Sequence, residues 1–253
     1  KLILFLSIFY MTIFLIAEVT AVSLLVKYIS GTNLWITAGI VIITSLIYTL
    51  YGGLRASLFT DNIQFVIFGL LLLIVFTNIF FLNLGNFNFD YITENKPYLL
   101  SSKYLPNFTA GLTFFIAVAA TNLFHQGNWQ RVYAANNNKV LKKSLFFSFL
   151  IILPIVFLMG FSGLIAVSQN ETVIPDLAFF SLILKENGIQ LSIIIIILAI
   201  SLTISSIDTL INAISSLIIV DGIKVFKGKK DYFKLSKQIV ILLSIVAFLV
   251  ASK

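Results

Sequence analysis

Long apolar stretches separated by short polar connections run along the whole chain. Seven stretches are long enough to cross a bilayer as helices, since ~30 Å of hydrocarbon is crossed at about 1.5 Å per helical residue. They are Leu2–Tyr28, Leu34–Tyr51, Ile63–Leu84, Phe108–Phe124, Leu145–Val167, Leu191–Val220 and Leu235–Ala251. The pattern predicts an all-α polytopic membrane protein with about seven transmembrane helices, in which residues 1–253 form a single transmembrane domain.

Three features interrupt this pattern. Pro154 falls inside one stretch and is expected to kink that helix. The segment after Phe124 is polar yet keeps helical character, which predicts a helix that breaks there and then continues. The apolar run Leu177–Leu184 is too short to span a membrane, so we expect it to form a helix on the outer face.

The composition supports a membrane protein and excludes other classes. Hydrophobic residues make up 59% of the chain and charged residues only 11%, against roughly 25% in an ordinary soluble domain. A mean hydropathy of +1.05 is too high for a soluble globule or a disordered chain. The chain has no cysteine, which excludes disulfides and thiolate metal sites. An apolar stretch begins directly after Lys1, which is typical of an internal fragment of a longer protein.

The distribution of Lys and Arg predicts an orientation in the membrane. These residues gather in cytoplasmic loops of membrane proteins, so the net charge of +7 is not evidence of nucleic-acid binding. If the connection containing Arg55 is cytoplasmic, alternation places twelve Lys and Arg residues inside and four in the outer loops. Residues 129–143 and 221–237 are then cytoplasmic. We expect a multi-pass protein of the plasma (inner) membrane.

A polar stripe follows one face of the stretch Leu191–Val220. At about 100° per residue, five polar side chains fall within about 40° of one line; they are Ser201, Ser205, Asp208, Asn212 and Ser215. The Leu202 carbonyl lies one turn before the hydroxyls of Ser205 and Ser206, and such a hard-oxygen cluster suits a small alkali cation. The alternative is helix–helix packing, because Ser and Thr are common at close helix contacts.

Three carboxyl groups in or near the membrane each need a partner. Asp208 lies beside the oxygen cluster, and Glu18 lies within the first stretch. Each is either a candidate for ion coupling or a hydrogen-bonded group between helices. Asp61 lies at the inner mouth. It is either a third candidate for ion coupling or, as the favoured interpretation, the N-cap of the next helix and an ion-pair partner of Arg55.

His125, the only histidine, lies at the expected break after Phe124. The neighbouring amide side chains are those of Asn122, Gln126 and Asn128. Irregular backbone at membrane depth lines a cavity or is buried in protein, so these four residues are candidates for contacting a solute or forming a gate. The alternative for His125 is a structural role. A metal site is not expected, since no second histidine or cysteine is available.

Three motifs resemble the sodium:solute symporter family. Tyr48–Ala56 and Thr60–Gln64 resemble its signature Y-T-x-x-G-G-L-x-A followed by T-D-x-x-Q. Gln130–Ala135 resembles its Q-R-x-x-A-A motif, and Ser205–Asn212 resembles its sodium-site helix, S-[ST]-x-x-S-x-L-x. The motifs occur in the order found in the family, and the resemblance covers essentially the whole chain.

The resemblance implies a LeuT-type architecture, which contains two inverted repeats of five helices. Residues 1–84 would be helices three to five of the first repeat, and residues 108–253 the first four helices of the second. It also implies that sodium is bound by the hydroxyls of Ser205 and Ser206 and by the carbonyl of Leu202. Sodium is then the coupling ion, and no cofactor is expected.

The implied function is a sodium-coupled secondary symporter that imports a small polar solute by alternating access. Sugar-transporting members have Asn at the position of His125 and a gating Tyr at that of Gly127. The segment His125–Arg131 instead resembles the urea- or polyamine-type branch. The expected partners are therefore sodium, a small polar solute and the lipid bilayer, and the sequence indicates no particular oligomeric state.

Two other functions compete with transport. The first is a transporter-like sensor module of a larger signalling protein, because some family members are fused to a histidine kinase. The second is an integral-membrane enzyme. One histidine, no cysteine and no paired membrane carboxylates offer no catalytic set, so an enzyme is not expected.

Overall fold

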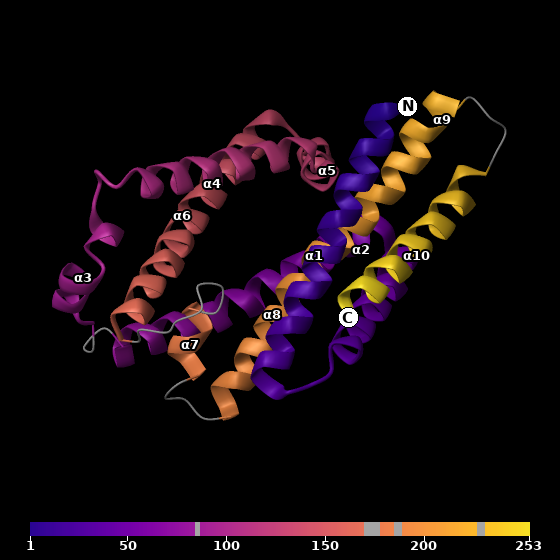
Figure 1. The fold of residues 1–253 in the computed structure, drawn as a ribbon. Helices are drawn as coiled ribbons and strands as arrows, with labels where there is room; N and C mark the ends of the chain where they lie inside the picture. Colours follow the sequence, from indigo (N-terminus) through magenta and orange to yellow (C-terminus); the bar gives the residue numbers. More distant parts are fainter. Residues whose placement is uncertain (84–86, 170–177, 185–188, 227–230) are drawn as a thin grey trace. The chain divides into compact units, whose positions relative to one another are not determined.

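A computed structural model describes residues 1–83, 87–169, 178–184, 189–226 and 231–253 (Figure 1). The described residues are almost entirely helical and include no strand. Six of their helices are long and apolar enough to cross a membrane: Leu2–Ser30, Leu34–Phe81, Leu105–Phe124, Asn138–Gln169, Ile189–Val225 and Tyr232–Ala251. The expectation of an all-α polytopic membrane protein is therefore confirmed.

Helix α2 (Leu34–Asn83) contains two of the expected stretches, so six spanning helices are found where seven were expected. If straight, its 50 residues would measure roughly 75 Å, more than twice the thickness of the hydrocarbon layer. The helix breaks at Gly53, whose φ of 55° and ψ of −150° lie outside the helical region. Glycine adopts a positive φ readily because it has no Cβ. The two arms of α2, before and after Gly53, correspond to the two expected stretches.

The connection expected between these two stretches is itself helical. The Thr60 hydroxyl lies 2.9 Å from the Ser57 carbonyl, and the Asn62 side chain donates to the Leu58 carbonyl at 2.9 Å. Polar side chains that bond to the backbone of their own helix do not require a loop. Asp61 therefore lies inside a helix, and the prediction that it caps a helix N-terminus was wrong.

The remaining elements follow in chain order. The first half of the chain contains α1 (Leu2–Ser30), α3 (Phe89–Asn95), η2 (Pro97–Leu100) and α4 (Leu105–Phe124). The second half contains α5 (Gln126–Ala134), α6 (Asn138–Gln169), α7 (Ala178–Leu184), α8 (Ile189–Ser216), the π-helix η4 (Leu217–Asp221), α9 (Gly222–Phe226) and α10 (Tyr232–Ala251). Pro154 lies inside α6. The short apolar run before Leu184 is helical as α7, and its first residue, Leu177, lies outside the described residues.

The chain divides into two compact units, each of which draws on both halves of the sequence. The first consists of Lys1–Leu70, Leu123–Tyr133 and Ile195–Lys253, and the second of Leu71–Asn122 and Ala134–Ile194. In the first unit, α1, the first arm of α2, α8 and α10 pack around an apolar core that includes Met11, Leu15, Val19, Val41, Ile207, Leu210, Ile214, Val240 and Ala247.

Aromatic contacts hold parts of the second unit together. The ring of Phe76 on α2 meets that of Phe179 on α7 edge to face, with centroids 6.2 Å apart. Phe80 is stacked on Phe161 of α6, also with centroids 6.2 Å apart. This packing is apolar, whereas long-range polar contacts between helices occur in the first unit.

Candidate functional site

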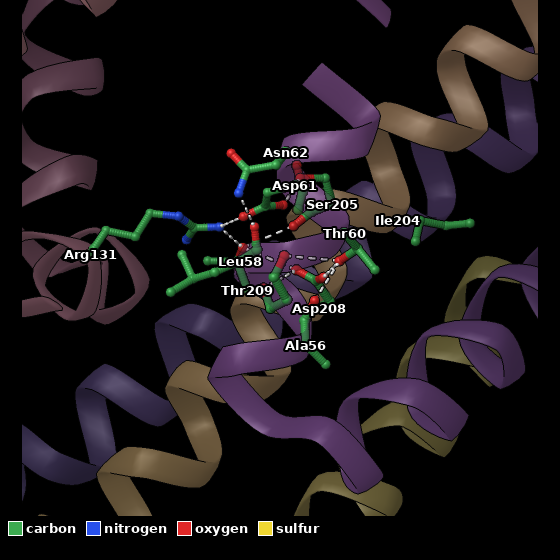
Figure 2. Close-up of polar contacts among 12 residues, drawn as sticks. Ala56, Leu58, Thr60, Asp61, Asn62, Arg131, Ile204, Ser205, Asp208 and Thr209 are labelled. Atoms are coloured by element: carbon green, nitrogen blue, oxygen red, sulfur yellow. Dashed lines mark hydrogen bonds and ion pairs between the residues drawn. The ribbon is translucent and has the colours of Figure 1, made fainter. Parts of the chain in front are cut away.

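The candidate site lies in the first unit, where residues of α2, α5 and α8 meet (Figure 2). At its centre, Asp208 of α8 is fully buried. The Tyr48 hydroxyl donates to its Oδ2 at 2.8 Å, and the Ser57 hydroxyl donates to its Oδ1 at 3.0 Å. The hydroxyls of Thr60 and Thr209 lie 3.5 and 3.2 Å from the same carboxylate. Asp208 is therefore surrounded by hydroxyl groups.

The break in α2 makes this arrangement possible. Tyr48 precedes Gly53, and Ser57 and Thr60 follow it, so both arms of α2 supply donors to one carboxylate. A buried carboxylate is costly unless its oxygens accept hydrogen bonds, and these hydroxyls meet that requirement. Asp208 thus fastens both arms of α2 to α8.

Asp61 has a different environment. Nη2 of Arg131, on α5, lies 2.5 Å from its Oδ2, and the Ser205 hydroxyl donates to its Oδ1 at 2.6 Å. The same Nη2 donates to the Thr209 hydroxyl at 2.7 Å. The expected ion pair with Arg55 was therefore wrong: the partner of Asp61 is Arg131, which the sequence places 70 residues further along the chain.

The predicted sodium ligands are only partly brought together. The Ser206 hydroxyl donates to the backbone carbonyl of Leu202 at 3.3 Å, as expected for a serine one helical turn further along. The Ser205 hydroxyl instead donates to Asp61. The oxygen cluster therefore adjoins the Asp61 carboxylate, a neighbour that helix spacing on α8 alone could not indicate.

The expected break after Phe124 is present. Helix α4 ends at Phe124, His125 is not helical, and α5 begins at Gln126. The backbone N–H of Asn128 donates to the His125 carbonyl at 3.0 Å. The indole of Trp129 donates to the Leu123 carbonyl at 2.8 Å, which ties α5 back across the break.

The His125 side chain lies against α1, where its ring meets that of Phe14 edge to face. Its Nδ1 is buried and has no hydrogen-bond partner among the described residues. Burial lowers the pKa of His125, and the positive charge of Arg131 acts in the same direction, so the imidazole is neutral at pH 7.

Gly127 brings α5 close to α8. A Cβ atom at this position would lie 2.3 Å from Cγ2 of Thr209, so no larger residue fits without a shift. Nearby, the Gln130 side chain lies 3.4 Å from the Asn212 carbonyl. The glycine explains how Arg131, one turn further along α5, reaches both Asp61 and Thr209.

Other predicted site residues lie apart from this network. Glu18 is half-buried on α1, and none of the described contacts joins it to Asp61 or Asp208. Asn122 belongs to the second unit. Gln126 and Asn128 lie at the start of α5, and their predicted role toward a solute stays a prediction.

Sequence reasoning missed several members of the network. They are Tyr48, Ser57, Arg131 and Thr209. Three of them were within the quoted motifs: Tyr48 in Tyr48–Ala56, Arg131 in Gln130–Ala135 and Thr209 in Ser205–Asn212. Their presence in the motifs was therefore a signal for the site, although the motifs did not indicate which residues they contact.

Comparison with known proteins agrees with the motifs. The sequence model of the sodium:solute symporter family matches residues 2–253. The chain belongs to this family. Among curated proteins, the spermidine transporter DUR31 of Candida albicans is 27% identical over 224 residues, which cover 87% of this chain and 41% of the relative. The symporter-family chain thus spans about two fifths of the length of that relative. No solved structure matches this chain.

Proposed function

We propose that the protein takes part in sodium-coupled import of a small polar solute. Sodium would be bound by the hydroxyls of Ser205 and Ser206 and by the Leu202 carbonyl. Family membership supports a role in solute transport. The observation that carries the sodium assignment is the 3.3 Å separation of the Ser206 hydroxyl from the Leu202 carbonyl oxygen, with a carboxylate adjoining Ser205.

This separation is that of a hydrogen bond donated by the Ser206 hydroxyl. The same two oxygens would fit one cation if the hydroxyl proton turned away from the carbonyl. Oxygens around Ca²⁺, a hard cation similar in size to sodium, lie at about 2.3–2.6 Å, so ligands at right angles are roughly 3.3–3.7 Å apart. The 3.3 Å between Ser206 Oγ and Leu202 O lies at the lower end of that range. Hard oxygen ligands also match the preference of an alkali cation.

Sodium entry would supply the driving force. Each charge that moves inward contributes about 2.3 kcal/mol per 100 mV, in addition to the concentration gradient. Alternating access couples this flow to the solute if sodium binds one conformation more tightly than the other. The proposal is therefore a symporter in which sodium occupancy selects the conformation that accepts the solute.

We further propose a solute that carries amine or amide groups. The curated relative is named as a spermidine transporter. The segment around the break offers groups that hydrogen-bond to such a solute, because His125 is neutral and its Nδ1 has no partner among the described residues. Asn128 and Gln126 lie beside it at the start of α5.

A sodium titration of solute uptake tests the proposal. In the full-length transporter in proteoliposomes, Ser206→Ala removes one ligand, and a lost charge-assisted contact costs about 1.5–3 kcal/mol. The sodium concentration for half-maximal uptake should then rise roughly tenfold to a hundredfold. Ser206→Thr keeps a hydroxyl and should have a milder effect.

Ser215→Ala is the matched control. It removes a serine hydroxyl from the same helix, roughly 13 Å further along α8 from Ser206. The Ser215 hydroxyl donates to that of Ser236 on α10. The sodium dependence of Ser215→Ala should be that of the wild type. Equal shifts in Ser206→Ala and Ser215→Ala would show that the hydroxyls serve packing, and uptake without sodium dependence in the wild type would refute the proposal.

A further inference from the structure

Arg131 connects the broken segment to Ser205 by two routes (Figure 2). In the first, Nη2 of Arg131 lies 2.5 Å from Oδ2 of Asp61, whose Oδ1 accepts from the Ser205 hydroxyl at 2.6 Å. In the second, Nη2 donates to the Thr209 hydroxyl at 2.7 Å, and that hydroxyl lies 2.9 Å from the Ser205 carbonyl. One route ends at the side chain of Ser205 and the other at its backbone.

We infer that Arg131 is a tethered cation that competes with the coupling sodium for the negative charge of Asp61. The inference rests on the proposed function, because it takes Ser205 as a sodium ligand. While Arg131 is docked, its charge cancels that of Asp61. When Arg131 leaves, Asp61 becomes an uncompensated negative charge beside Ser205, and Coulomb attraction then favours a cation there.

The ion pair of Arg131 and Asp61 is not fully covered by the described residues. The side chain of Arg131 is 33% exposed and that of Asp61 is 21% exposed. The described residues therefore leave part of both side chains uncovered. An ion pair of this kind is also weak compared with a buried one, so it can open during a transport cycle.

The location of Arg131 makes this competition depend on the position of α5 relative to α8. It lies on α5, which follows the break at His125 and approaches α8 through Gly127. Any movement that separates α5 from α8 withdraws the guanidinium from both Asp61 and Thr209. Arg131 is therefore a positioning residue that links the conformation of the broken segment to the charge at the sodium site.

Direct sodium binding measures the competition without depending on the solute. The probe is sodium chloride, titrated against choline chloride at constant ionic strength, and the readout is the melting temperature of the purified full-length transporter. Arg131→Gln should lower the half-saturating sodium concentration about tenfold, because Asp61 loses its competing cation. Arg131→Lys keeps the charge and should restore a value close to that of the wild type.

The maximal rate of uptake should fall in Arg131→Gln, even though sodium binds more tightly. Sodium that binds more tightly leaves more slowly, so Arg131→Gln should lower the maximal uptake rate while it lowers the sodium concentration for half-maximal uptake. A purely structural defect would lower the rate without tightening sodium binding. An unchanged or raised half-saturating sodium concentration in Arg131→Gln would overturn the inference.

Two further variants make the test specific. Arg55→Gln removes an exposed positive charge from α2, six residues before Asp61, and should leave sodium binding unchanged. In an Asp61→Asn background, Arg131→Gln should have no additional effect, since the charge for which it competes is gone. Additive effects, or an equal shift in Arg55→Gln, would contradict the competition.

The sodium titrations separate this inference from the proposed function. Suppose that the wild type responds to sodium and that Ser206→Ala shows the expected loss. If sodium binding in Arg131→Gln is then unchanged, only the inference about Arg131 is refuted. A wild type with no sodium response refutes both.

Discussion

Asp208 and Asp61 are two carboxylates of one site that are held in different ways. Asp208 is fully buried, and its contacts are hydroxyls from α2 and from its own helix. Asp61 is partly exposed, accepts one hydrogen bond from the Ser205 hydroxyl on α8 and faces a guanidinium on α5. Hydroxyls on two packed helices fix a carboxylate in place, whereas an ion pair to a separate segment can be exchanged. From this contrast we propose an architectural role for Asp208 and an electrostatic role for Asp61.

The largest expected effect comes from Asp208→Ala. The Ser57 hydroxyl is buried and would lose its described acceptor, and Tyr48 would keep only a 3.5 Å contact with the Ile204 carbonyl. A buried donor left without a partner costs about 1–3 kcal/mol, so the two losses and the lost packing should lower the free energy of unfolding by about 3 kcal/mol. Chemical denaturation of the purified full-length protein measures this change.

Glu18→Gln is the control for Asp208→Ala. Glu18 is a half-buried carboxyl in the first unit, on α1, and it takes no part in the Asp208 network. Its replacement should change the free energy of unfolding by much less than that of Asp208. If both variants lose the same stability, the hydroxyls around Asp208 have no architectural role and the contrast with Asp61 fails.

Patterns local in sequence predicted much of the fold. Apolar stretches identified the spanning helices, and the loss of apolar character after Phe124 identified the break before α5. The joining of two stretches into α2 was not predicted, because residues 52–62 were expected to connect two helices and include the polar side chains of Thr60 and Asn62. They bond to carbonyls of their own helix instead, a choice that hydropathy does not reveal.

At the site, too, contacts local in sequence could be predicted and long-range contacts could not. Leu202 and Ser206 are one helical turn apart, so their contact follows from helix geometry. The partners of the carboxylates are distant in sequence: Arg131 is 70 residues from Asp61, and Ser57 is 151 residues from Asp208. Such contacts depend on how the helices pack, which the spacing of residues along one helix cannot specify.

A smaller effect is expected for Tyr48→Phe. The change removes a single hydrogen bond of 2.8 Å to Asp208 and retains the ring. The Ser57 hydroxyl still donates to the carboxylate, so the free energy of unfolding should fall by about 1 kcal/mol. The half-saturating sodium concentration, measured by the melting-temperature titration, should match that of the wild type.

Tyr48→Phe and Arg131→Gln together sharpen the contrast between the two carboxylates. The first should affect stability and spare sodium binding, and the second should affect sodium binding and largely spare stability. A shift in sodium binding in Tyr48→Phe as large as that in Arg131→Gln would mean that both carboxylates act on the ion.

The smallest expected effect is that of His125→Ala, which tests whether α5 influences the ion only through Arg131. His125 precedes α5, packs against Phe14 and contacts neither carboxylate in the described structure. If it bonds to the solute, its loss removes one neutral hydrogen bond, worth about 0.5–1.5 kcal/mol, or roughly twofold to tenfold in solute affinity. His125→Gln keeps a donor and an acceptor and should retain part of that affinity.

Uptake measured against solute and against sodium separates the two parameters. The solute concentration for half-maximal uptake should rise and the sodium concentration should not, whereas a shift confined to sodium would show that the break itself, and not Arg131 alone, controls the charge at Asp61.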